Sequence, residues 1–217
     1  MPSSPVFTND TNRLKALYDE QAENYYTNFT RSLAQVACDT TSEAQYSLAR
    51  TCKDCERDYK NWLCSVLIPR CEGWSATDDF LQERNINEML PDGSKTHNDN
   101  MTDAFREEKR DRFAYSGSRN PMIDKDIRPG PYKEMLPCED LCFDIVRSCP
   151  AQLGFSCPNS PARELTYGNR DRGSDTLTCS FPGAVVKLNV QGAAGLLSPR
   201  VRYVIVTTTL AMALGGI

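Results

Sequence analysis

The chain has 217 residues, 40% of them hydrophobic, and a formal net charge of −4. This length suits one domain with tails, and the composition allows a hydrophobic core, so the chain is not disordered throughout. The weak negative charge gives no electrostatic case for a nucleic-acid partner. The single histidine, His97, excludes chemistry that needs two imidazoles, and no serine lies in a nucleophile-elbow pattern. We therefore expect no enzyme activity and no cofactor.

Apolar periodicity predicts a first helix over residues 12–37. Tyr25, Phe29, Leu33 and Val36 recur at steps of three and four residues, so they would share one face of this helix. We expect that face to be buried against the rest of the domain.

A second helix is predicted over residues 53–67. Its apolar residues follow the spacing of a buried helical stripe: Tyr59, Trp62, Leu63, Val66 and Leu67. Cys55 lies one turn before this stripe and shares its face. Pro69 ends the helix, because proline has no amide hydrogen to continue the hydrogen-bond ladder.

Residues 75–130 have a different character, since they are polar, charged and interrupted by turns that contain glycine or proline. We predict a long irregular loop on the surface, and loops of this length are functional or disordered. The expected fold is therefore mainly α, with helices joined by disulfide bonds, little β structure and one long loop.

Residues 138–149 form a third predicted helix, which Pro150 ends. Cys138, Cys142 and Cys149 are spaced so that their sulfurs project from one helix face. Cysteines at these spacings in one helix cannot bond to each other without distortion. We therefore expect each sulfur to reach a different segment, which makes this helix the centre of the core.

The chain beyond the last cysteine forms a separate part, so we divide it into a cysteine-rich domain over 1–182 and a tail over 183–217. Alternating apolar and polar residues at 186–190 predict a short strand, and residues 192–195, all glycine and alanine, form a flexible linker.

The last stretch, residues 204–217, is apolar but shorter than the roughly 20 residues that a membrane-spanning helix needs. It fits a lipid-anchor signal whose cleavage triplet would be residues 192–194. An irregular tail that docks on the domain or on a membrane, and a short membrane span, stay open as alternatives.

Ten cysteines give an even count, which predicts a disulfide framework and an oxidising compartment. Cys52 and Cys55 could instead form a redox pair, and the same two with Cys64 and Cys71 could bind zinc. The helical, polar flanks argue against the redox pair, and the spacing on one helix argues against the zinc site. We therefore predict disulfide bonds.

Three Asn-X-Thr triplets predict N-glycosylation at Asn9, Asn28 and Asn100, which also indicates secretion. The first residues lack the charged start and apolar stretch of a signal peptide. We resolve this conflict by expecting the chain to be the C-terminal part of a longer secreted protein or a truncated gene model. A cytosolic thiol or zinc protein is the competing interpretation.

The order of the cysteines resembles the frizzled-like cysteine-rich domain. In that family a Leu-Cys-Ser block follows a cysteine, as at 55–71, and a Pro-Cys…Leu-Cys…Arg…Cys block follows later, as at 137–149. A Gly-Phe element at 154–155 and a Leu-x-Cys-x-Phe-Pro element at 177–182 complete the likeness. The resemblance implies a helical fold held by five disulfide bonds.

The motifs resemble more closely those of the fungal stretch-activated calcium-channel regulatory subunit, the "Mid-one" family. Its signature is similar to Tyr-Lys-Asn-Trp-Leu-Cys-Ser-Val…Ile-Pro-Arg-Cys at 59–71 and to the Pro-Gly-Pro-Tyr-Lys-Glu segment from Pro129. Leu-Pro-Cys-Glu-Asp-Leu-Cys at 136–142 and Ser-Cys-Pro-Ala at 148–151 agree as well. The resemblance covers about residues 14–182.

This second resemblance implies a non-catalytic regulatory subunit that docks on a pore-forming, voltage-gated-type calcium channel subunit of the Cch type and promotes calcium influx. It would lie at the extracellular face of the plasma membrane, and in the endoplasmic reticulum membrane as well, held by association or by a lipid anchor. We expect the partner-binding face to be the 75–130 loop together with exposed parts of the disulfide-bonded helices, with Arg106, Lys109 and Arg110 as contacts. The alternative is a frizzled-like receptor module that binds a lipid or a lipidated ligand.

The frizzled resemblance also implies three bonds: Cys55–Cys149, Cys138–Cys179 and Cys142–Cys157. Four cysteines then remain for two more bonds. Chain order pairs them as Cys38–Cys71 and Cys52–Cys64, and the rival pairing is Cys38–Cys64 and Cys52–Cys71. The choice stays open.

Overall fold

The computed structural model describes residues 11–39, 50–96, 112–170 and 176–184. The chain divides into two units, residues 1–184 and 185–217, and the second lies outside the described residues. The predicted strand, linker, lipid-anchor signal and apolar tail therefore lie outside them too. Among the described helices, none is both long enough and apolar enough to cross a membrane.

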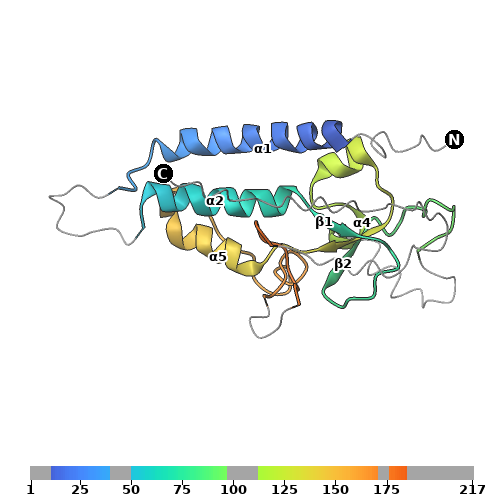
Figure 1. Cartoon of the computed structure of the whole chain (residues 1–217). Helices are drawn as coiled ribbons and strands as arrows, with labels where there is room; N and C mark the ends of the chain where they lie inside the picture. Colours follow the sequence, from blue (N-terminus) through green and yellow to red (C-terminus); the bar gives the residue numbers. More distant parts are fainter. Residues whose placement is uncertain (1–10, 40–49, 97–111, 171–175, 185–217) are drawn as a thin grey trace, which may run out of the picture. The chain divides into compact units, whose positions relative to one another are not determined.

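The three longest described helices of the first unit are α1 (Thr11–Leu33), α2 (Cys52–Leu67) and α5 (Glu139–Ser148). Figure 1 shows α1 and α5 on opposite sides of α2, which is the central element. The predicted helices have these bounds within one or two residues, except that α1 ends at Leu33. Val36 lies beyond the end of α1, so its predicted place on the helix face is wrong.

Residues at both ends of α2 explain why it begins and stops where it does. The side chain of Thr51 accepts a hydrogen bond from the Asp54 amide at 3.2 Å, and the Asp54 carboxylate accepts one from the Thr51 amide at 3.0 Å. This reciprocal cap satisfies two amides that the first turn leaves without helical partners. Pro69 follows directly after the C-terminal end, as the sequence predicts.

The core lies where the three helices meet. The rings of Phe29 in α1 and Tyr59 in α2 stack with centroids 3.7 Å apart and planes within 5° of parallel. Around them lie the other buried members of the cluster: Leu33, Cys38, Cys55, Leu63, Leu67, Ile145 and Cys149. Tyr25 is not part of this core, since 49% of its surface is exposed. Its predicted burial is wrong, because Ala22 and Tyr26, not Tyr25, continue the buried face of α1 before Phe29.

The first unit also contains a small antiparallel sheet and three short helical segments, two of them between β2 and β3 in the chain and one after α5. Its strands are β1 (Arg70–Glu72), β2 (Leu81–Arg84) and β3 (Tyr132–Met135), in the order β1-β3-β2. The short helical segments are α4 (Phe113–Ser116), the π-helical η1 (Ile123–Ile127) and the 3-10 helix η2 (Ala151–Leu153). The described parts of 75–130 are mostly irregular, as predicted, but β2, α4 and η1 interrupt them, so the prediction of one irregular loop is correct only in part.

Buried ion pairs join this polar segment to β3, and two apolar residues of the segment, Ile86 and Ile123, are buried as well. Glu134 is 1% exposed and its carboxylate lies 2.7 Å from the Arg84 guanidinium and 2.7 Å from that of Arg119. Burial lowers the pKa of Arg119, and the neighbouring Glu134 carboxylate opposes that change. The Arg84 side chain also donates to the carbonyl of Ala114 at 2.6 Å.

A second buried network fixes the turn that leads to η1. The side-chain amide of Asn85 donates to Asp124 at 2.9 Å, and the backbone amide of Ser118 donates to the other oxygen of that carboxylate at 2.8 Å. The Tyr132 hydroxyl donates to the Ser118 hydroxyl at 2.9 Å. Since buried polar groups are tolerated when each finds a partner, a polar sequence can fold here without an apolar pattern.

Candidate functional site

Three disulfide bonds join α5 and its flanks to distant segments, in the pairs that the frizzled resemblance implies. The bonds are Cys55–Cys149, Cys138–Cys179 and Cys142–Cys157, with Cα atoms 4.6, 4.9 and 5.9 Å apart. The prediction that the three sulfurs of this helix reach separate segments is thus confirmed. Cys138 and Cys149 are the residues that flank α5 at its two ends, so the helix is fixed at both.

The remaining bond differs from both pairings that we considered. Cys38 is bonded to Cys52, with Cα atoms 5.0 Å apart, and Cys64 and Cys71 carry free thiols. There are therefore four disulfide bonds among the ten cysteines, all of which are described, and not the five that the resemblance implies.

The course of the chain explains this difference. Cys38 follows the end of α1 and Cys52 begins α2, and the two helices run side by side in opposite directions, so these residues meet where the chain turns back. Cys64 lies twelve residues further along α2, which is about 18 Å at the rise of a helix. It can reach neither Cys52 nor Cys38. Because Cys52 and Cys55 are in separate disulfides, the redox-pair and zinc interpretations also fail.

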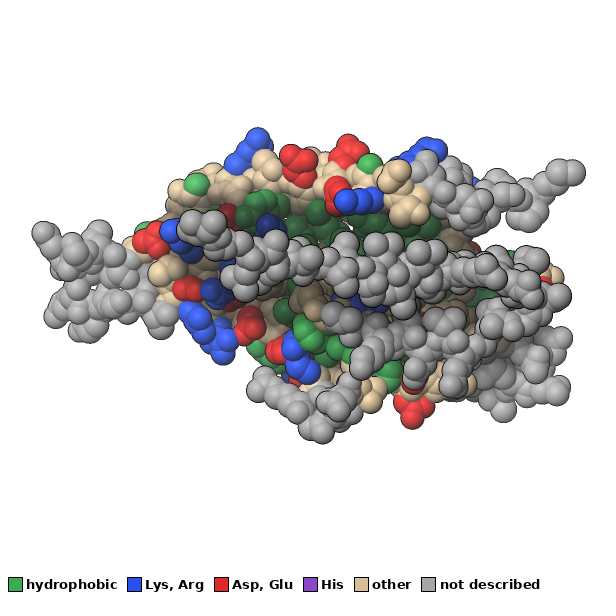
Figure 2. Space-filling view, viewed as in Figure 1, with side chains coloured by type: hydrophobic (Ala, Val, Ile, Leu, Met, Phe, Trp, Pro, Cys, Tyr) green, Lys and Arg blue, Asp and Glu red, His purple; other side chains and the backbone are tan. Residues whose placement is uncertain are grey.

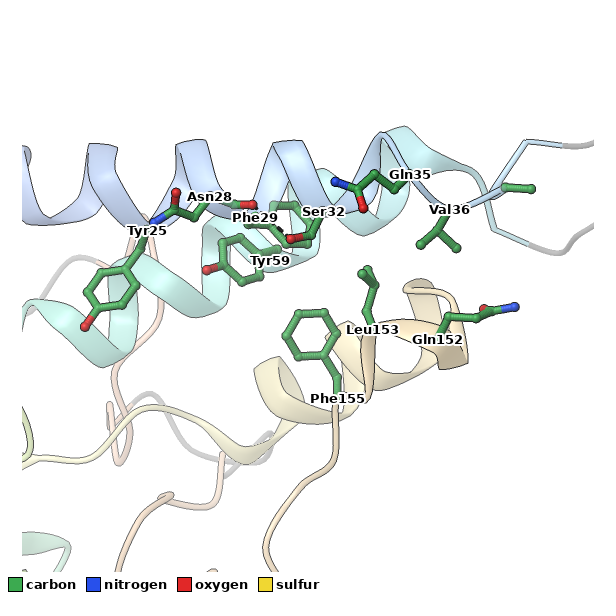
Figure 3. Close-up of a pocket in the computed structure, with 11 residues that line it drawn as sticks. Tyr25, Asn28, Phe29, Ser32, Gln35, Val36, Tyr59, Gln152, Leu153 and Phe155 are labelled. Carbon is green, nitrogen blue, oxygen red and sulfur yellow. Dashed lines mark hydrogen bonds between the residues drawn. The ribbon is translucent and has the colours of Figure 1, made fainter.

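A groove with a volume of about 770 Å³ lies between α1 and the segment 152–155 that follows α5 (Figure 3). Phe29 and Tyr59 form its floor, and Phe155 stands across from them with its ring centroid 6.2 Å from that of Phe29. Burial raises the pKa of Tyr59, which keeps its hydroxyl neutral. The floor is therefore aromatic and uncharged.

The rim of this aromatic groove is polar but also uncharged. It is formed by Tyr25, Asn28 and Ser32 on α1, by Gln35 just after the end of α1, and by Gln152 on the opposite side. No aspartate, glutamate, lysine or arginine lines the groove among the residues described. Such a surface suits a neutral ligand with apolar faces and a few hydrogen-bonding groups.

The sequence predicted only part of this groove. The Gly-Phe element at 154–155 belongs to the frizzled resemblance, but nothing in the local pattern places Phe155 against α1. That contact exists because Cys149 and Cys157 are bonded on either side of the segment, which holds it beside the helices.

Of the predicted glycosylation and contact residues, only Asn28 falls within the described residues, where it is exposed on α1 and lines the groove. The others lie outside them: Asn9, Asn100, Arg106, Lys109 and Arg110. Figure 2 shows charged side chains of both signs along the outer face of α1, with hydrophobic side chains gathered beneath it. The visible part of this face has no extended patch of one charge.

Comparison with known proteins assigns the chain to a family. Residues 1–185 match the Mid1 family, which is described as a stretch-activated Ca2+-permeable channel component. The stretch-activated cation channel yam8 of Schizosaccharomyces pombe is 38% identical over 167 residues, which cover 76% of this chain and 28% of that protein. No solved structure matches the chain.

Two further relatives carry the name stretch-activated cation channel MID1. The one from Saccharomyces cerevisiae is 32% identical over 187 residues, covering 84% of this chain and 28% of its own length. The one from Cryptococcus neoformans is 28% identical over 157 residues, covering 72% of this chain and 22% of its own length. The chain thus spans less than a third of each relative. With a family match over most of its length, the chain belongs to the Mid1 family of stretch-activated Ca2+-permeable channel components.

Proposed function

We propose that this chain is the cysteine-rich, non-catalytic docking body of a regulatory subunit. The subunit would bind the extracytosolic side of a Cch-type pore-forming subunit of a voltage-gated-type calcium channel and promote calcium influx. Membership of a family of channel components supports this role. Since the chain covers about 28% of two of its relatives, the activity of the whole protein is part of the proposal.

The observation that carries the proposal is the disulfide-bonded centre of the helical unit. Cys55 is 0% exposed, and its bond to Cys149 joins α2 to the end of α5 inside the core. A bond that closes a chain of 94 residues restricts the unfolded state strongly and favours one rigid surface. Rigid surfaces bind partners at a lower entropic cost than mobile ones.

Disulfide bonds persist in oxidising compartments, so the four bonds support a place on the extracellular face of the plasma membrane or in the endoplasmic reticulum. Association with the pore subunit, or a lipid anchor attached near residues 192–194, would hold the protein at the membrane. A frizzled-like fold is part of the same proposal. It rests on the order of the cysteines and on the three bonds that the likeness implies.

The test is co-purification of the pore subunit with the full-length protein from fungal membranes, together with calcium influx in the same cells. Charge reversal at Arg106, Lys109 and Arg110 should reduce both, without lowering the thermal stability of the purified protein. Arg31→Glu, on the exposed side of α1, is the matched control and should change neither. If the triple variant recovers the pore subunit and supports calcium influx as the wild type does, this contact surface is refuted. If the wild-type protein does not recover the pore subunit, docking itself is refuted.

A frizzled-like receptor module for a lipid or a lipidated ligand is the second candidate, and the aromatic groove favours it. A floor of Phe29, Tyr59 and Phe155 would suit an acyl chain. Native mass spectrometry of protein purified from membranes distinguishes the two, since a bound lipid would support the receptor. A pore subunit recovered with lipid-free protein would support the regulatory subunit.

A further inference from the structure

We propose that Asn28 carries an N-linked oligosaccharide whose first sugars lie in the aromatic groove and cover it. The inference rests on the extracytosolic location in the proposed function, because the donor is available only there. Asn28 is the sequon residue that lines the groove, so the attachment point and the binding surface coincide.

Asn28 is available for the modification. It is exposed, and the Ser32 hydroxyl donates to its backbone carbonyl at 3.1 Å, not to its side chain. Phe29, the middle residue of the sequon, is 6% exposed and points into the core. Successive residues of a helix point about 100° apart, so the burial of Phe29 turns Asn28 away from the core and towards the rim.

Helix geometry directs the oligosaccharide towards Tyr25. Side chains in an α-helix lean towards its N-terminus, over the residues three and four positions earlier. For Asn28 the residue three positions earlier is Tyr25, which is 49% exposed. Figure 3 shows Asn28 and Tyr25 as neighbours along α1, with the Tyr25 ring below the helix at one end of the groove. A sugar attached at Asn28 would begin over that ring.

The chemistry of the groove fits a neutral sugar better than a charged ligand. The faces of Tyr25 and Phe155 can pack against the C–H faces of sugar rings, while Ser32, Gln35 and Gln152 can hydrogen-bond their hydroxyls. The groove lacks charged lining residues among those described, so a phosphate or carboxylate would find no counter-charge. Covalent attachment also gives the first sugars a high local concentration at the groove.

Transfer of the oligosaccharide to Asn28 involves no oxidation or reduction. The bond that forms joins Nδ2 of Asn28 to the anomeric carbon of the first sugar. The bond that breaks joins that carbon to the diphosphate of a lipid-linked oligosaccharide, which is the co-substrate. The lipid diphosphate leaves with the bonding electron pair, and the amide nitrogen gives up one proton to a base of the transferase. The linked amide keeps one hydrogen.

The first test is glycopeptide mass spectrometry of the full-length protein from a eukaryotic secretory pathway. We expect the peptide that contains Asn28 to carry an oligosaccharide, and Asn28→Gln and Thr30→Ala each to abolish it. If Asn9 or Asn100 is glycosylated while Asn28 is not, this inference is refuted and the extracytosolic location stands. If none of the three is glycosylated, both the inference and that location fail.

The second test measures whether the sugars cover the groove. Hydroxyl-radical labelling of Tyr25 should be low in the glycosylated protein and should rise after the oligosaccharide is trimmed to its first sugar, and further in Asn28→Gln. Phe143, which is 45% exposed on α5 and is not among the groove residues, is the matched control and should not change. Equal labelling of Tyr25 in the glycosylated protein, the trimmed protein and Asn28→Gln would show that the sugars do not cover the groove. So would protection of Tyr25 that appears only when the pore subunit is bound.

Discussion

Replacing the two cysteines of the Cys55–Cys149 bond by alanine should cost more stability than removing any shorter bond. This bond closes 94 residues, whereas Cys142–Cys157 closes 15. In the chain-entropy estimate the loss is about 4.7 kcal/mol for the long loop and about 3 kcal/mol for the short one. None of the other bonds provides a shorter path between Cys55 and Cys149, so the full length applies.

The assay is thermal and urea unfolding of the two paired variants, C55A/C149A and C142A/C157A, against the wild type under non-reducing conditions. Removing both cysteines of a pair avoids a new free thiol. For a domain of this size each kcal/mol lowers the melting temperature by about 2–4 °C, so the long-loop variant should melt about 9–19 °C below wild type. Equal losses in the two variants, or a larger loss in C142A/C157A, would refute the loop-entropy reasoning.

Three further predictions concern the described part of the chain. Glu134→Gln should lower the free energy of unfolding in urea by about 3–5 kcal/mol, because it leaves two buried guanidinium groups without a counter-charge. The control Asp144→Asn breaks an exposed pair with Arg147 and should lower it by less than about 1 kcal/mol. Similar losses in the two variants would contradict the buried cluster. Thr51→Ala removes the side-chain half of the α2 cap and should cost about 1 kcal/mol, measured in the same way, and no loss would show that the cap does not stabilise the helix. Burial raises the pKa of Tyr59 and Tyr132 above the ordinary value of about 10. Their contribution to stability is therefore present below pH about 10 and is lost as the pH rises through the folded-state pKa. The urea midpoint should fall between pH about 9 and about 11, and an unchanged midpoint would contradict the burial of these tyrosines.

The helices could be predicted because their signals are local. The stripe that includes Tyr59 and Leu63 has the helical period, and Pro69 and Pro150 mark two of the ends. The exposed Tyr25 belongs to the same periodic pattern as Phe29, and only the packing of α1 on α2 separates them. Periodicity finds the helix but does not decide whether Tyr25 or its neighbour Tyr26, which packs against the core, continues the buried face.

The sheet could not be predicted because the polar residues that it buries find their partners far away in the chain. Arg84 and Glu134 are 50 positions apart, and each alone suggests a solvated surface. Burial becomes acceptable only when both are present with Arg119, which no local window contains. A polar stretch with frequent turns therefore resembles a loop even where it forms strands.

The disulfide bonds likewise fall into those that the order of the motifs predicts and one that depends on how the helices pack. Order along the chain was enough for bonds such as Cys55–Cys149, whose flanking motifs are distinctive. It was not enough for Cys38 and Cys52, because their bond depends on α1 ending four residues earlier than predicted and on the return of the chain into α2. The groove was missed for a related reason, since one wall comes from the segment held between two such bonds.

Peptide mapping of the native full-length protein without reduction, after alkylation of free thiols, tests most directly whether the helices form one covalently joined body. We predict four linked pairs of peptides: Cys38–Cys52, Cys55–Cys149, Cys138–Cys179 and Cys142–Cys157. We expect no link between Cys64 or Cys71 and any of these eight. Alkylation of Cys55 or Cys149 in the unreduced protein, or either residue linked to another partner, would contradict the rigid docking body.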